Sequence, residues 1–194
     1  MPLERPQSTG RRDSGTVAVE TAIVSLFLVV LLFGIVESSF LLKDWLSVSA
    51  AARAGARMGS SEPRGLNFAQ DSADQVTNAI SGLDPTKLQA VWVYKTTGPG
   101  NLSNATGLPD SGSFANCSVC VQFKWDGALK KLVYLSGTWA NTSQNACAGD
   151  PNRDALGVYV NYKHTGMGFF FNNAVVSEST VMWIEPTTNP ICHP

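Results

Sequence analysis

An apolar run of 27 residues, from Thr16 to Leu42, is the feature that most constrains this chain. As a helix that rises about 1.5 Å per residue, the run would be about 40 Å long, which is enough to cross a bilayer. Arg5, Arg11 and Arg12 precede it, and Lys43 is the only base close behind it. The positive-inside rule therefore predicts a cytoplasmic N-terminus and places the rest of the chain outside.

A cleaved secretory signal is the alternative interpretation, because basic residues followed by an apolar core are its general form. This run is longer than an ordinary signal core, and the small residues after it, SVSAAARAGAR (47–57), continue a helical pattern. We therefore favour a retained membrane anchor.

The remaining length and composition suit one modest domain. The chain has 194 residues, of which 44% are hydrophobic and 15% charged, and its net charge is −1. The 14 basic residues are dispersed, so a nucleic-acid partner has no support. We expect a leader at 1–15, a transmembrane and protruding helix at 16–60, and an extracytoplasmic domain at 61–194.

Four cysteines follow the membrane segment: Cys117, Cys120, Cys147 and Cys192. An even number of cysteines in an oxidising compartment predicts disulfides, for which three connectivities are possible. A metal site is the alternative, because Cys117 and Cys120 form a CxxC and His193 adjoins Cys192. Zinc ribbons usually pair two such motifs, so we favour disulfides and predict no metal and no cofactor.

Hydrophobic periodicity predicts the elements of the domain. The helical pattern that starts at Thr16 continues to about Met58, and apolar residues three and four apart predict an amphipathic helix over 67–83. Alternation and β-branched content predict strands at 87–96, 117–125, 156–164 and 174–186. The segment LKKLVYLSGTW (129–139) fits a helix or a strand. The order predicts an α+β fold with an antiparallel sheet of about four strands packed on helices.

Three segments together resemble the TadE-like family of pseudopilins from tight-adherence (Tad, type IVc) pilus systems. The first is Gly15 followed by TVAVETAIVSLFLVVLLFGIVE, and the second is the small-residue helix with paired arginines at 47–60. The third is the C-terminal pair GVYVNYKHTGMGFF and VVSESTVMWIEP, which is similar to the family's final hairpin. Glu20 precedes Thr21 instead of the aromatic residue that pilins of these systems tend to carry, and the chain lacks the large extra domain of TadG-like relatives. A minor component of the TadE or TadF type fits these features.

The resemblance implies that a prepilin-type peptidase cuts between Gly15 and Thr16. A glycine before the cut lets the backbone approach the enzyme closely, because it has no Cβ. The new amine of Thr16 would lie four residues before Glu20, about 6 Å along a helix. The resemblance implies that Glu20 pairs with such an amine, in its own chain or in a neighbour. The alternative is that Glu20 is solvated at the membrane edge.

Three further residues are candidates for helix assembly. Glu37 lies near the outer end of the apolar run, where we expect it to be solvated unless it pairs with another helix. Arg53 and Arg57 lie four apart, beside a small-residue face made by Ala51, Gly55 and Gly59. A solvated surface and an assembly contact are equally compatible with these arginines.

We find no motif that would support an enzyme: no HExxH, no GxSxG, no P-loop and no dinucleotide turn. The sequence predicts a minor pilin-like protein of the inner membrane that helps initiate, prime or cap a Tad-type pilus. Its expected partners are the membrane, the prepilin-type peptidase, other Tad pilins or pseudopilins and the assembly platform. The alternative is a static, membrane-anchored binding module, but its aromatic residues, such as Trp92 and Trp139, are more often core.

Overall fold

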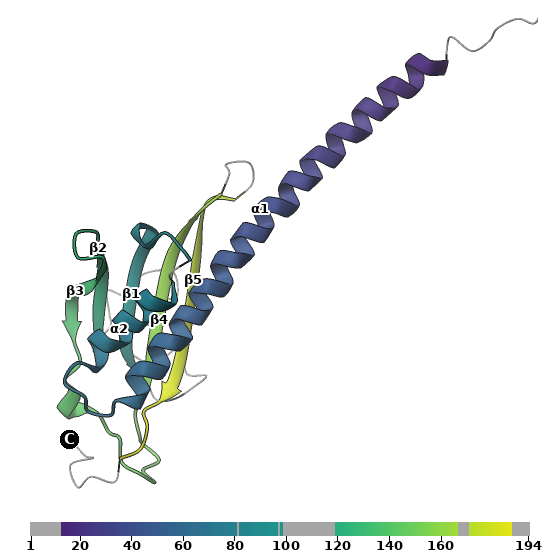
Figure 1. The fold of residues 1–194 in the computed structure, drawn as a ribbon. Helices are drawn as coiled ribbons and strands as arrows, with labels where there is room; N and C mark the ends of the chain where they lie inside the picture. Colours follow the sequence, from purple (N-terminus) through teal and green to yellow (C-terminus); the bar gives the residue numbers. More distant parts are fainter. Residues whose placement is uncertain (1–12, 81, 97, 99–118, 167–170, 188–194) are drawn as a thin grey trace, which may run out of the picture.

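The computed structural model describes residues 13–80, 82–96, 98, 119–166 and 171–187 (Figure 1). Its two α-helices are α1 (Asp13–Ser61) and α2 (Phe68–Ala79), and short 3₁₀ turns cover Pro85–Lys87 and Asn141–Ser143. Its strands are β1 (Leu88–Thr96), β2 (Cys120–Asp126), β3 (Lys131–Thr138), β4 (Ala155–Thr165) and β5 (Asn172–Trp183).

The strands form one antiparallel sheet in the order β3-β2-β1-β4-β5, and both helices cover the same face of it (Figure 1). This confirms the predicted α+β fold. The described sheet has five strands rather than about four, because 131–138 is a strand. As an edge strand β3 is exposed at most positions, with only Leu132 fully buried, so the segment has little of the alternation that identifies a strand.

Helix α1 has two halves in different surroundings. From Gly15 to Phe33 every residue is exposed, and this half of the helix projects away from the head (Figure 1). By the head we mean the described chain that follows α1. From Glu37 onward residues spaced three and four apart are covered by the head, which is the pattern of one covered helix face. These covered positions include Glu37, Leu41, Asp44, Val48, Ala51, Ala52, Gly55, Ala56 and Gly59.

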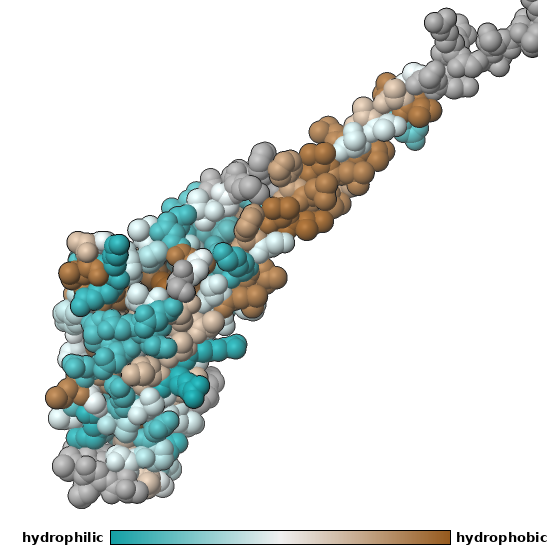
Figure 2. All heavy atoms as spheres, in the orientation of Figure 1, coloured by the Kyte–Doolittle hydropathy of each residue, from teal (hydrophilic) through white to brown (hydrophobic). Residues whose placement is uncertain are grey.

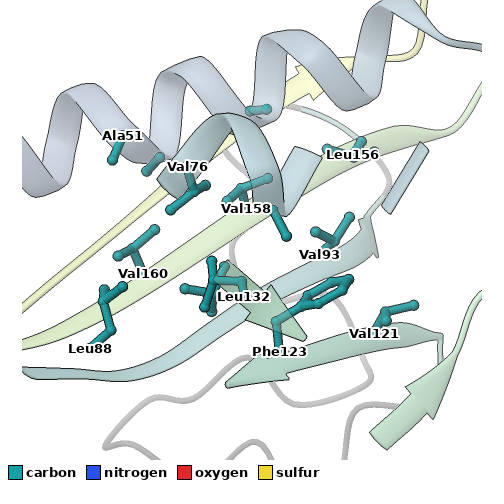
Figure 3. Packing of buried hydrophobic residues seen from close by; sticks show 14 of the residues in the cluster. Ala51, Val76, Leu88, Val93, Val121, Phe123, Leu132, Leu156, Val158 and Val160 are labelled. Atoms are coloured by element: carbon teal, nitrogen blue, oxygen red, sulfur yellow. The ribbon is translucent and has the colours of Figure 1, made fainter. Parts of the chain in front are cut away.

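The main core lies between the two helices and the sheet (Figure 3). Ala51 of α1 and Val76 of α2 face Val158 and other β-branched or large apolar side chains from four strands, and most are fully buried. Each fully buried side chain of this size stabilises the fold by about 1.5–3 kcal/mol. The head is therefore assembled on the second half of α1.

The opposite face of the sheet carries a smaller cluster made by Trp92, Tyr94, Cys120 and Tyr159. Burial raises the pKa of the Tyr94 hydroxyl to about 12. The expectation that the tryptophans are core residues is confirmed for Trp92 and for Trp139, which packs edge-on against Phe68.

Helices α1 and α2 approach closely because glycine faces the contact. A Cβ on Gly55 would lie 2.6 Å from Val76 Cγ2 and 3.0 Å from the Ser72 carbonyl oxygen. The Ser72 hydroxyl donates a 2.6 Å hydrogen bond to the Gly55 carbonyl oxygen. The small-residue face of Ala51, Gly55 and Gly59 therefore packs inside its own chain.

We expect Gly55→Ala to lower the free energy of unfolding of the head by about 1–3 kcal/mol, because overpacking costs that much. A decrease in the free energy of unfolding would be informative, because alanine normally stabilises a helix by about 1 kcal/mol relative to glycine. Thermal unfolding of the purified protein in detergent measures the change. Arg57→Ala, an exposed change two residues away, should have little effect, and an unchanged Gly55→Ala protein would contradict the tight contact.

Candidate functional site: the projecting helix and its junction

The projecting half of α1 is the most distinctive surface of the molecule. It belongs to the one helix in the described chain that is long and apolar enough to cross a membrane, and the head buries none of its most apolar window. Figure 2 shows hydrophobic residues along this half and further down beside the head. In water such a surface is very unfavourable, because exposed apolar area costs about 25 cal/mol per Å². The structure thus supports the expected membrane anchor.

Gly15, Thr16 and Glu20 lie in the first turns of this half, and all three are exposed. Nothing lies within 4 Å of the position that a Cβ on Gly15 would occupy. The peptide bond after Gly15 is thus free of the head, and Glu20 has no described neighbour outside its own helix that would hold it in place. The processing of Gly15 and the pairing of Glu20 remain predictions.

Where α1 enters the head, three of its side chains contact the β4–β5 hairpin. We call this contact the stalk–head junction, where the stalk is helix α1. It comprises Glu37, Asp44 and Trp45 on α1, with His164, Phe171 and Glu178 opposite. Glu37 is 1% exposed, and its Oε1 accepts a 3.1 Å hydrogen bond from the Phe171 amide. The expectation that Glu37 is solvated is therefore wrong. Sequence alone could not show that a strand pair folds back over this turn of the helix.

His164 and Asp44 form the second contact of the junction. The imidazole is 2% exposed, and its Nδ1 lies 2.7 Å from Asp44 Oδ2. An ionised carboxylate can only accept, so Nδ1 carries the hydrogen. Burial raises the pKa of the Tyr162 hydroxyl nearby, and the negative charge of Asp44 adds to the shift. A lone histidine in the sequence gives no signal of such a partner.

Gly166 allows the hairpin to reach α1. A Cβ at this position would overlap Glu37 Oε1 and would lie 3.4 Å from His164 Nε2. Any larger residue would push the hairpin away from Glu37. The third contact is a hydrogen bond from the Trp45 indole N–H to Glu178 Oε1, so the junction continues along β5.

The other candidate residues lie elsewhere. Arg53 and Arg57 are exposed on the outer face of α1, away from the junction. Cys120 and Cys147 are buried, and both take part in disulfide bonds in the structure. The predictions for Cys117 and Cys192 concern positions outside the described residues. Among the described residues, no group of three His, Cys, Asp or Glu side chains could hold a metal ion.

We expect Asp44→Ala to lower the free energy of unfolding by about 1–3 kcal/mol, because it leaves the buried Nδ1–H of His164 without its acceptor. Asp44→Asn should cost less, since the amide oxygen can still accept. Chemical denaturation in detergent, followed by tryptophan fluorescence, gives both values. Equal losses for the two variants would show that the hydrogen bond does not stabilise the junction.

Residues 15–57 match the family model described as TadE-like protein. This confirms the resemblance noted in the sequence, and the matched segment covers the projecting half of α1 and most of the half that enters the head. Comparisons with the curated proteins and with the solved structures give no match. The match is confined to helix α1 and does not reach the sheet of the head.

Proposed function

We propose that this TadE-like protein is a minor pseudopilin that helps to initiate, prime or cap a Tad-type IVc pilus. One observation carries the proposal: a fully exposed apolar helix is continuous with the helix on which the head is built. Such a helix can pack laterally against the helices of other pilins in the membrane, while the head contacts partners outside. In this arrangement the N-terminus is cytoplasmic, the anchor lies in the inner membrane, and residues 1–15 are the leader.

Processing and Glu20 belong to the same proposal. An ionised carboxylate at the centre of a bilayer costs roughly 2.5–3.5 kcal/mol on insertion scales, and Glu20, near the end of the span, would carry part of this cost. After a cut by a prepilin-type peptidase, the amine of Thr16 would lie one helical turn from Glu20 and would offset this cost. Because Gly15 is exposed and clear of the head, the peptidase can reach it without unfolding the domain.

The remaining partners follow from the two exposed surfaces of α1. Its apolar half is available to other Tad pilins or pseudopilins and to the assembly platform. Arg53 and Arg57 stay exposed beside the head, so they are available for a charged contact with a neighbouring subunit. The disulfide-bonded Cys120 and Cys147 suit an oxidising compartment outside the cytoplasm.

We expect the protein recovered from membranes to begin at Thr16 and to lack residues 1–15 only when its prepilin-type peptidase is present. Intact mass and N-terminal sequencing measure both cases. Gly15→Leu should block the cut, because its side chain prevents close approach of the backbone. A chain that starts at Met1 with the peptidase present would favour the static anchored module, and a start well beyond Leu42 would indicate a secreted protein.

We expect Glu20→Gln to be cut normally but to lose at least about tenfold of its co-purification with pilins, since about 1.4 kcal/mol of lost pairing corresponds to a factor of ten. Quantitative mass spectrometry of crosslinked membranes gives the ratio. Thr21→Val, also exposed and one residue away, is the matched control and should co-purify normally. Normal recovery of pilins by Glu20→Gln would remove the carboxylate from the assembly mechanism.

A further inference from the structure

The exposed apolar surface of α1 continues past the length that a bilayer requires. A hydrocarbon core of about 30 Å takes about 20 helical residues. Leu42, Trp45 and Leu46 nevertheless remain about half exposed, and Val175 of β5, at 56% exposed, lines a groove together with Leu42 and Trp45. We call these four residues the apolar collar. This groove between α1 and β5 runs through the collar, and its lining includes Leu41, Leu42, Trp45 and the β5 residues Ala174–Ser177.

The junction fixes the height of the collar relative to the membrane. If the hydrocarbon begins between Thr16 and Glu20, a span of about 20 residues ends between Ile35 and Ser39. The head first closes over α1 at this level, because Glu37 is buried there against Phe171. Trp45 contacts Glu178 two turns further on, so the first part of β5 lies beside α1 just outside the hydrocarbon (Figure 1). The collar therefore occupies the level of the lipid headgroups.

The residue types of this surface suit lipid. Tryptophan is enriched at membrane interfaces, where its ring lies in the apolar boundary and its N–H finds a polar partner, here Glu178. Lys43 on the same stretch is also exposed, and its ammonium donates a 3.4 Å hydrogen bond to the Gly82 carbonyl oxygen of the head. The serines on the same stretch present no open donor, because the Ser38 and Ser39 hydroxyls each donate 2.8 Å bonds to carbonyls of their own helix.

We propose that the collar rests in the headgroup region of the outer leaflet, so that the β5 side of the head lies against the membrane. The occupant of the groove is then lipid, which continues the lipid contact of the projecting half. This proposal rests on the proposed membrane anchor. It adds a fixed orientation of the head, with β5 toward the bilayer and the β3 edge away from it.

The test is depth-dependent fluorescence quenching of the full chain in phosphatidylcholine vesicles that contain lipids brominated either near the headgroup or near the chain end. Comparison of the wild type with Trp45→Phe isolates the emission of Trp45. We expect the headgroup-proximal bromine to quench this emission about twofold more than the chain-end bromine, because tryptophan at this level lies near the interface. Trp183 is the matched control, isolated by Trp183→Phe. It lies about 26 Å from Val175 along the same strand and should not be quenched.

Because Trp45→Phe also removes the bond to Glu178, a second variant separates lipid contact from local structure. Val175→Trp in the Trp45→Phe background moves the indole to β5, and it should restore the preference for headgroup-proximal quenching. Absence of quenching at both positions would overturn the proposal. So would quenching that disappears as the protein-to-lipid ratio rises, because another copy of the chain would then cover the collar.

Flotation of the vesicles distinguishes a wrong orientation of the head from failure of the membrane anchor itself. Protein that floats with the vesicles but shows no quenching at the collar contradicts only the orientation of the head. Protein that does not float contradicts the membrane anchor on which the proposed function also depends.

Discussion

The whole structure depends on one unbroken helix whose first half is fully exposed and apolar and whose second half is packed against the head. The first half of α1 exposes only its side chains, and its backbone hydrogen bonds are made within the helix, which is the condition for crossing hydrocarbon. Its second half supplies small residues, such as Ala51 and Gly55, at the centre of the head. Because no proline interrupts residues 16–61, the head and the anchor share one rigid axis.

The junction explains why an acid can lie at the end of the apolar run. Glu37 avoids hydrocarbon because the Phe171 amide donates to it inside the head. Asp44 and Trp45 repeat this arrangement two turns further along the helix, each with a polar partner on the hairpin. Most buried polar groups in proteins are hydrogen-bonded, so the contacts of the buried Glu37 and His164 also fix the register of the hairpin on the helix.

Local patterns predicted most of the fold, because each element has a strong period or clear boundaries. Helix α1 and the strands around Val93 and Val158 follow from apolar content that needs no knowledge of neighbours. The segment that forms strand β3 fits a helix or a strand by its sequence, since an exposed edge strand has few buried positions to reveal its period. The partners of Glu37 and His164 could not be predicted, because they are 134 and 120 residues distant in sequence from the groups that bind them.

The length of the contact between α1 and the head has a mechanical consequence. A pull on the projecting half acts along the axis of α1, which contacts the head from Glu37 to Gly59. Such a load shears many contacts at once, whereas a load across the helix would peel them one by one. The end of α1 that joins the rest of the chain is the far end, so tension draws the head toward the source of the pull.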